Sequence, residues 1–178
     1  MSGHSKWSKV KHQKAVSDAV KGKLFTKAAH AIAIAIREGG GVGDPVGNFK
    51  LRLAIEKARA VNMPKEHIDR AIARAIGQGG EALERITYEG YGPGGTALLI
   101  ETATDNRQRT VSIIRNMLSA HGGGLGSPGS AQYAFEESGD GYRAKIVIPV
   151  SDDQREKLSA MVDALEAFDD VLRVFVNV

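Results

Sequence analysis

The stretch GTALLIETAT, residues 95–104, is followed almost at once by NRQRTVSIIRNMLSAH, residues 106–121, and this pair decides the fold class. The first segment is a short, nearly continuous apolar run, which is typical of a buried strand. The second segment has helical spacing and places four apolar residues on one face: Val111, Ile114, Met117 and Leu118. The sequence therefore predicts a strand that leads directly into an amphipathic helix.

The rest of the C-terminal half continues this alternation. Two further strands are predicted at 130–136 and 142–150, joined by the tight turn ESGDG, and a helix at 152–168 precedes a final strand at 171–178. The order β-α-β-β-α-β is that of the ferredoxin-like, or split βαβ, arrangement, in which one four-stranded sheet carries both helices on one face. We therefore expect an α+β domain here.

The N-terminal half is predicted to be helical. Residues 15–37 contain many helix formers and are followed by three consecutive glycines from Gly39, which stop a helix. The alternation AIAIAI at 31–36 has the two-residue period of a strand, but both alternating residue types are apolar, so we interpret it as part of a buried helix. Its expected core face comprises Phe25, Ala29, Ile32 and Ile36.

Two more helices are expected after the glycine-rich loop at 39–48. One covers 50–62 and is expected to direct three apolar side chains inward: Phe49, Leu53 and Ile55. Pro64 suits the first turn of the other helix, which Gly77 terminates and in which three isoleucines recur every fourth residue. The N-terminal half is thus predicted to be a three-helix unit.

The positive charge is confined to one half of the chain. Residues 1–74 hold 15 Lys and Arg against 6 Asp and Glu, a net charge of +9, whereas residues 75–178 hold 9 against 15, a net charge of −6. Such an asymmetry favours a basic module for a polyanion beside an acidic or neutral body. We therefore expect two domains: a basic all-helical RNA-binding domain at 1–77 and the α+β domain at 80–178.

Composition restricts the compartment and the chemistry. The chain has no cysteine, which excludes disulfides, thiolate metal sites and thiol nucleophiles. Its longest apolar run, at 31–36, is far shorter than the roughly 20 residues of a membrane span, and no apolar signal-peptide core follows the basic N-terminus. We expect a cytoplasmic protein without a membrane partner.

No catalytic constellation can be recognised. The five histidines are scattered, Glu66-His67 lacks the zinc-protease spacing, and the two glycine-rich loops lack the Lys-Ser/Thr of a phosphate-binding loop. We expect no enzyme activity, no catalytic residue, no metal site and no cofactor. An enzyme with an unrecognised site is the alternative from another functional class.

Three features have a structural as well as a functional interpretation. YEGYGPGG at 88–95 is interpreted as an interdomain linker with turn-forming residues. His30, in an apolar helix, is interpreted as a core residue whose hydrogen bonds are satisfied. Arg107 and Arg109 fall in the first turn of a predicted helix, where positive charge opposes the helix dipole, so an anion-binding role and a structural role are equally open.

The opening stretch MSGHSKWSKVKHQKAV carries the strongest functional signal. Four lysines surround one tryptophan, so cations that can pair with phosphates lie beside a ring that can stack on a base. A solvated tail is the alternative, and we favour nucleic-acid binding over it. A second basic element, NMPKEHIDR at 62–70, places Lys65 at an exposed helix start.

At these residues the chain resembles the YebC family, which includes the mitochondrial translational activator of cytochrome oxidase. The resemblance covers residues 1 to about 136 in consecutive order and resumes in LSAMVDALEAFDDVLRVFVNV. Its motifs are GHSKW (3–7), KHQKA (11–15), GKLFTK (22–27), RLAIEKARAVNMPKEHIDRAI (52–72), YEGYGPGG (88–95), TDNRQRT (104–110) and the glycine-rich run at 121–130.

The resemblance implies a factor that works on nucleic acid. Family members are described either as transcriptional regulators or as translation factors that bind the large ribosomal subunit near the peptidyl-transferase region and relieve stalling, notably at proline-rich stretches. We prefer the ribosome, because lysines beside a stacking aromatic suit irregular RNA and no helix-turn-helix is recognisable. The expected partners of a monomeric chain are the large subunit, ribosomal RNA and tRNA, with duplex DNA as the alternative.

The expected nucleic-acid contacts follow from this preference. Met63, Pro64 and Lys65 are expected to form a tip presented towards tRNA or ribosomal RNA. The other expected contacts are His4, Ser5, Lys6, Trp7, Lys9, Lys11, His12, Lys14, Lys23, Lys27, Arg107 and Arg109.

The sequence departs from the family at one place. Typical members carry a third, acidic α+β domain after the strand equivalent to SAQYAFE, whereas here ESGDG at 137–141 leads directly into the next strand. The family insertion is therefore expected to be absent near 137–141, which puts in doubt any family function that needs it.

Overall fold

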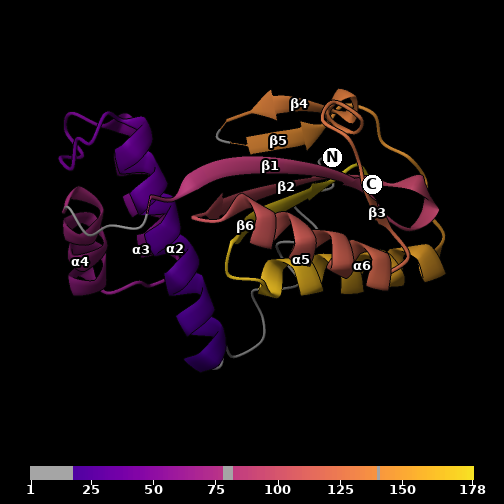
Figure 1. The fold of residues 1–178 in the computed structure, drawn as a ribbon, viewed down its shortest axis with the longest axis horizontal. Helices are drawn as coiled ribbons and strands as arrows, with labels where there is room; N and C mark the ends of the chain where they lie inside the picture. Colours follow the sequence, from indigo (N-terminus) through magenta and orange to yellow (C-terminus); the bar gives the residue numbers. More distant parts are fainter. Residues whose placement is uncertain (1–17, 78–81, 140) are drawn as a thin grey trace. The chain divides into compact units, whose positions relative to one another are not determined.

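The computed structural model describes residues 18–77, 82–139 and 141–178 (Figure 1). The described residues fall into two compact units. One contains three helices and residues up to 86 together with 103–105, and the other contains residues 87–102 and 106–178. The order of elements, helices first and then mixed strands and helices, confirms the predicted α+β class.

The helical unit consists of α2 (Asp18–Glu38), α3 (Phe49–Ala60) and α4 (Lys65–Ile76). The AIAIAI segment lies within α2, as predicted, and Ile32, Ile34 and Ile36 are all at most 1% exposed. The core between the three helices is formed by Ile32, Ala35, Ile36, Leu51, Ala54, Ile55, Ala58, Met63 and Ile68. Burial on more than one side of the helix thus explains the two-residue apolar alternation.

Asn48 fixes the loop between the first two helices. Its Oδ1 accepts the Leu51 N–H at 3.0 Å, which caps α3, while its Nδ2 donates to the carbonyls of Ala35 and Val42, both at 3.0 Å. Gly39 lies so close that a Cβ there would be 2.2 Å from Asn48 Nδ2. The glycine run is therefore required by this close approach as well as by helix termination.

The phase of α3 differs from the prediction in one respect. Phe49, predicted to point inward, is 67% exposed, whereas Ile55 is buried as expected. Because the Asn48 cap makes Phe49 the first helical residue, the buried face instead begins at Leu51. The guanidinium of Arg52 lies 5.3 Å from the Phe49 ring centre, so the exposed ring is covered by a cation from its own helix.

The second unit is built on a four-stranded sheet in the order β3-β1-β2-β6. Its strands are β3 (Gly124–Leu125), β1 (Glu84–Tyr91), β2 (Ala97–Thr104) and β6 (Val171–Val176). Every residue of β2 is buried, and β2 runs antiparallel to β6. Burial on both faces explains why the sequence of β2 is a nearly continuous apolar run.

The two helices of this unit, α5 (Arg107–Ala120) and α6 (Asp152–Ala167), cover one face of the sheet (Figure 1). Leu98 and Ile100 of β2 pack there against Ile114, Leu118, Leu158, Met161 and Leu165. Ala97 and Leu99 face the other side, where they pack against Ala131, Ala134, Phe135 and Phe175. The predicted pair of helices on one face is thus confirmed.

The composition of the sheet differs from the prediction in its detail. The strands expected at 130–136 and 142–150 are the hairpin β4 (Phe135–Ser138) and β5 (Gly141–Ala144), which forms a separate two-stranded sheet. Their place in the main sheet is taken by β3 and by β1, whose last residues belong to the YEGYGPGG segment that was interpreted as a linker. Only the end of that segment is a turn, the 3-10 helix Pro93–Gly95, in which Gly94 has φ 75°. No described helix is long and apolar enough to cross a bilayer.

The predicted domain boundary leads to a first test. A fragment of residues 80–178 should fold alone, because the sheet and its two helices bury their own apolar core on both faces. Its NMR spectrum should show dispersed amide signals, and calorimetry should show one cooperative thermal transition. A collapsed spectrum, next to a dispersed one from the full chain, would mean that the helical unit is needed for this unit to fold.

Candidate nucleic-acid interface

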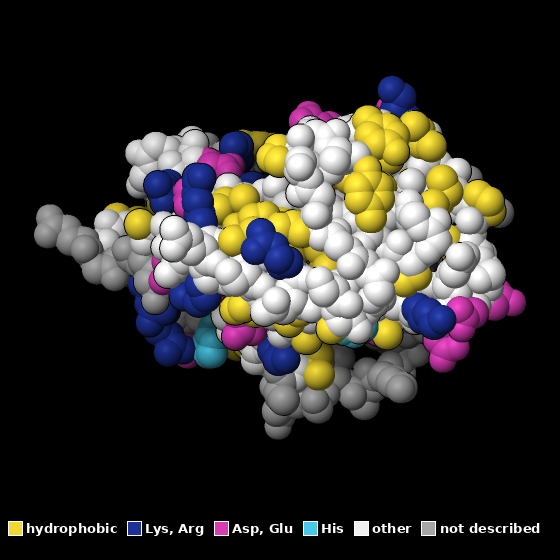
Figure 2. Space-filling view, turned by 45° about the vertical axis from the view of Figure 1, so that its right-hand side comes forward, with side chains coloured by type: hydrophobic (Ala, Val, Ile, Leu, Met, Phe, Trp, Pro, Cys, Tyr) yellow, Lys and Arg dark blue, Asp and Glu magenta, His cyan; other side chains and the backbone are white. Residues whose placement is uncertain are grey.

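The helical unit carries an exposed positive surface. Residues 18–77 contain 11 Lys and Arg against 6 Asp and Glu. All but one of these cations, Lys27, are classed as exposed, and dark-blue side chains gather over the helices in Figure 2. The exposed cations are Lys21, Lys23, Arg37, Lys50, Arg52, Lys57, Arg59, Lys65, Arg70 and Arg74. The positive charge that the sequence concentrates in this half of the chain therefore lies on the surface of the helical unit.

The expected contacts of the lysine arm cannot be placed. His4, Ser5, Lys6, Trp7, Lys9, Lys11, His12 and Lys14 lie outside the described residues. Of the next two expected contacts, both on α2, Lys23 is exposed and Lys27 is half-buried. These two lysines are four residues apart, so they share one face of the helix.

The predicted tip is only partly a surface feature. Pro64 and Lys65 are exposed at the start of α4, but Met63 is 6% exposed and belongs to the helical core, so it is not part of an exposed tip as the sequence suggested. Asn62 has φ 60°, and this turn lets the Met63 N–H donate to the Ala58 carbonyl at 3.0 Å. The backbone therefore turns the methionine inward and leaves the proline and the lysine outside.

An apolar pocket of about 440 Å³ lies beside Lys65. Isoleucines of α3 and α4 line it, Arg59 and Lys65 contribute positive charge, and Asp69 contributes a negative charge. Such a surface places an apolar contact area beside cations that can pair with phosphates.

The structure gives the arginines in the first turn of α5 different environments. Arg109 Nη2 lies 3.1 Å from Asp170 Oδ2, and the same carboxylate accepts the Thr110 hydroxyl at 2.6 Å. Asp170 is 8% exposed. This partner offsets the unfavourable helix-dipole position of Arg109 and removes the sequence argument for an external anion there. Arg107 is exposed.

The interpretation of His30 also changes. The residue is half-buried in α2, but its Nδ1 atom is buried and has no hydrogen-bond partner among the described residues. It is therefore not the satisfied core histidine that the sequence suggested. No group of three or more potential metal ligands occurs in the described parts of the chain.

Glu89 is the principal polar group that the sequence reasoning missed. It lies near the end of β1 and is 8% exposed, and its carboxylate accepts three backbone N–H groups: Gly129 at 2.5 Å, Ala131 at 2.7 Å and Gln132 at 2.8 Å. Burial raises the pKa of Glu89, but these three hydrogen bonds together outweigh burial and hold the pKa below its ordinary value. The only indication of this role in the sequence was that an acid occurs within the tyrosine- and glycine-rich segment YEGYGPGG.

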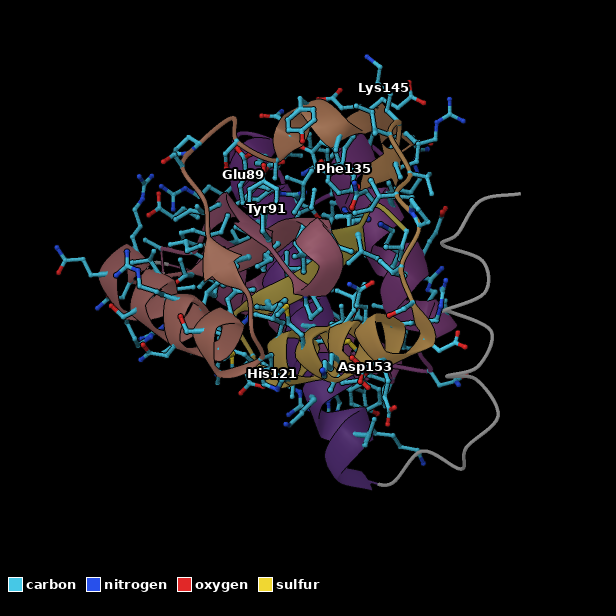
Figure 3. The ribbon with its side chains drawn as sticks, turned by 90° about the vertical axis from the view of Figure 1, so that its right-hand side faces the viewer. Glu89, Tyr91, His121, Phe135, Lys145 and Asp153 are labelled. Atoms are coloured by element: carbon cyan, nitrogen blue, oxygen red, sulfur yellow. The ribbon has the colours of Figure 1, made fainter. Side chains whose placement is uncertain are left out.

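Tyr91, two residues after Glu89 on the same face of β1, contacts the same segment near residue 130. Glu89 and Tyr91 lie side by side in Figure 3, and the Tyr91 hydroxyl donates to the Ser130 carbonyl. Burial, with contributions from Tyr133 and Glu89, raises the pKa of Tyr91, so the phenol stays protonated as a donor. Gly123 permits the close approach of this region, because a Cβ there would lie 2.3 Å from the Tyr91 carbonyl oxygen. The two glycine-rich motifs thus form one assembly.

Comparisons with known proteins match almost the whole chain. Residues 5–78 match the family described as the TACO1/YebC protein N-terminal domain, and residues 83–141 match the TACO1/YebC second and third domain. The resemblance drawn from the motifs is thereby confirmed.

Individual relatives agree with this match. A "probable transcriptional regulatory protein" from Roseiflexus castenholzii is 48% identical over 99% of this chain and 71% of its own length. One from Chloroflexus aurantiacus is 59% identical over 78% of this chain, which corresponds to 55% of that relative. The crystal structure of a conserved hypothetical protein from Aquifex aeolicus is 30% identical, with a TM-score of 0.85 over 97% of this chain and 96% of that chain.

Glu89 provides a test by acid titration. Glu89→Gln should lower the free energy of unfolding at pH 7 by about 2 kcal/mol, because the new amide group cannot serve three N–H donors as a carboxylate does. Since the folded-state pKa lies below the ordinary 4.5, the stabilisation by Glu89 is complete above that value and is lost as the pH falls through the folded-state pKa.

The measurement is urea denaturation of wild type and variant over a pH series. The stability difference between them should shrink on acidification below the ordinary pKa. The exposed Glu137, changed to Gln, is the matched control and should show little difference at any pH. A difference that stays constant through this range would contradict the role of the Glu89 charge.

Proposed function

The chain belongs to the TACO1/YebC family, and from this we propose that it is a non-catalytic factor that binds ribosomal RNA of the large subunit and relieves stalled translation, notably at proline-rich stretches. The observation that carries the proposal is the exposed positive surface of the helical unit. Phosphate neutralisation by lysine and arginine supplies most of the affinity of proteins for nucleic acid without requiring sequence recognition.

Two features favour RNA over duplex DNA as the ligand. Cations are spread over all three helices instead of along one helix that could enter a major groove. The apolar pocket beside Lys65 offers a surface for an unstacked base next to cations, and unstacked bases are characteristic of irregular RNA. Docking by this unit would leave Pro64 and Lys65 as its exposed tip.

The second candidate is a DNA-binding transcriptional regulator. It is favoured by the names of the relatives, which are called probable transcriptional regulatory proteins. The two functions differ in the ligand that should bind more tightly at equal salt concentration. Cytoplasmic location and action as a monomer belong to the same proposal.

Ribosome binding is tested by co-sedimentation. The chain should sediment with 50S particles, and its affinity should fall steeply with salt. Changing Lys6, Lys9, Lys11 and Lys14 together to Gln should flatten the log–log salt dependence by several units, at about 0.7 per phosphate contact with single strands. The same salt series with duplex DNA distinguishes the two functions. Tighter binding to a specific duplex than to 50S particles would replace the translation proposal by the regulator.

The tip is tested separately, in a translation system stalled on a run of prolines. Lys65→Ala should leave 50S binding nearly intact and reduce the yield of full-length product, because the tip is proposed to act after docking. Met63→Ala is a contrasting variant, since truncating a buried methionine should destabilise the helical unit by about 2 to 5 kcal/mol. Unchanged rescue by Lys65→Ala would contradict the role of the tip.

A further inference from the structure

A second pocket of the helical unit, of about 400 Å³, is lined by two arginines and two histidines among small apolar side chains. Helix α2 contributes Ala29, His30 and Ala33, and Leu83 lies at one side. Helix α4 contributes the rest of the lining: His67, Arg70, Ala71, Arg74 and Ala75. All of these residues belong to one compact unit.

The helix periodicity explains why this pocket is open and basic. His67, Arg70 and Arg74 are spaced by three and four residues, so they lie along one face of α4. The same helix buries Ile68 in the core with a different face. Where α2 and α4 line the pocket, four of the positions are alanines, and these short side chains leave room between the longer basic ones.

The two arginines lack the neighbours that would make them structural. Like charges four residues apart on a helix repel each other. In the described residues neither arginine forms an ion pair; Arg70 only donates its Nε to the Glu66 carbonyl of its own helix, at 3.2 Å. Arg74 gains from its place in the last turn of α4, but the helix dipole does not explain Arg70.

The imidazoles complete the polar lining. His30 lines the pocket, and its Nδ1 is buried without a hydrogen-bond partner in the described chain, which is costly. The ring of His67 is held by Phe25, edge to face, with the ring centres 5.9 Å apart. The pocket therefore combines two planar guanidinium groups with an unsatisfied imidazole and a positioned one.

We infer that this pocket binds a phosphate group of a nucleotide, carried either by a free mononucleotide or by an RNA strand. Guanidinium groups match phosphate oxygens with paired N–H donors, and an imidazole N–H adds a further donor. The volume is within the range of small-ligand sites and is sufficient for one nucleotide unit. The inference goes beyond ribosome docking, because it assigns a discrete site that the protein carries without the ribosome.

The test is an NMR titration of the ¹⁵N-labelled full chain with inorganic phosphate, with adenosine monophosphate and with a short single-stranded RNA. Amide signals of residues 29–33 and 70–75 should shift with saturation. Arg70→Gln with Arg74→Gln should weaken binding of the mononucleotide by about tenfold or more, because charge-assisted hydrogen bonds are lost.

The matched control removes the same charge from the neighbouring helix. Arg52 and Lys57 of α3 are exposed and line neither of the two pockets, so changing both to Gln should leave mononucleotide binding nearly unchanged. His30→Leu is a second variant. It should weaken binding without lowering the melting temperature, because it removes a buried polar atom that lacks a partner.

The outcomes separate the two sources of phosphate. Shifts with the mononucleotide support a free-nucleotide site, and shifts with RNA alone support a strand phosphate. Equal weakening by the α3 and α4 double variants would mean unspecific attraction and would overturn the inference, as would the absence of shifts with all three ligands. Because no ribosome is present, failure here is distinct from failure of 50S co-sedimentation.

Discussion

The buried carboxylate of Glu89 is the interaction on which the α+β unit depends. It gathers the N–H groups of Gly129, Ala131 and Gln132 around one charge, and so it fixes the segment that covers the second face of the sheet. Ala131 and Ala134 of that segment pack on the sheet, and the hairpin starts immediately afterwards, at Phe135. Without this charge, the segment that covers Leu99 would lose these three hydrogen bonds and keep its apolar packing and the Tyr91 hydrogen bond to Ser130.

The buried acids of the α+β unit and the exposed arginines Arg70 and Arg74 of the helical unit differ in whether they form ion pairs within the described residues. We interpret the paired acids as structural and the two arginines as functional. In the α+β unit buried acids have partners within the unit: Glu101 pairs with Arg173 at 2.7 Å, and Asp170 pairs with Arg109. Buried ions of this kind are expensive unless they are paired, so they report on folding. In the helical unit, Arg70 and Arg74 lie on the surface without an ion pair in the described residues, and a polyanionic ligand would offset the repulsion between these two like charges.

The sequence was sufficient where local periodicity decides the outcome. The three helices, β2, α5, α6 and β6 follow from apolar spacing and from caps such as Pro64 and Gly77. It was insufficient where distant segments meet. Neither the joining of Glu89 to residues 129–132 nor that of Arg109 to Asp170 leaves a periodic trace, and Met63 was misplaced because the left-handed turn at Asn62 cannot be inferred from spacing.

The position of the hairpin bears on the insertion that the sequence is expected to lack near residues 137–141. Strands β4 and β5 pair only with each other, in register from Phe135 opposite Ala144 to Ser138 opposite Gly141, and they are not members of the four-stranded sheet. The hairpin is attached to the rest of the unit through side chains such as Tyr142, whose ring meets that of Phe175 edge to face at 5.4 Å. A segment inserted at the turn would therefore lengthen a peripheral sheet without changing any strand pairing of the central one. The central sheet and its two helices would consequently keep their strand pairing and their core whether or not a segment is inserted there.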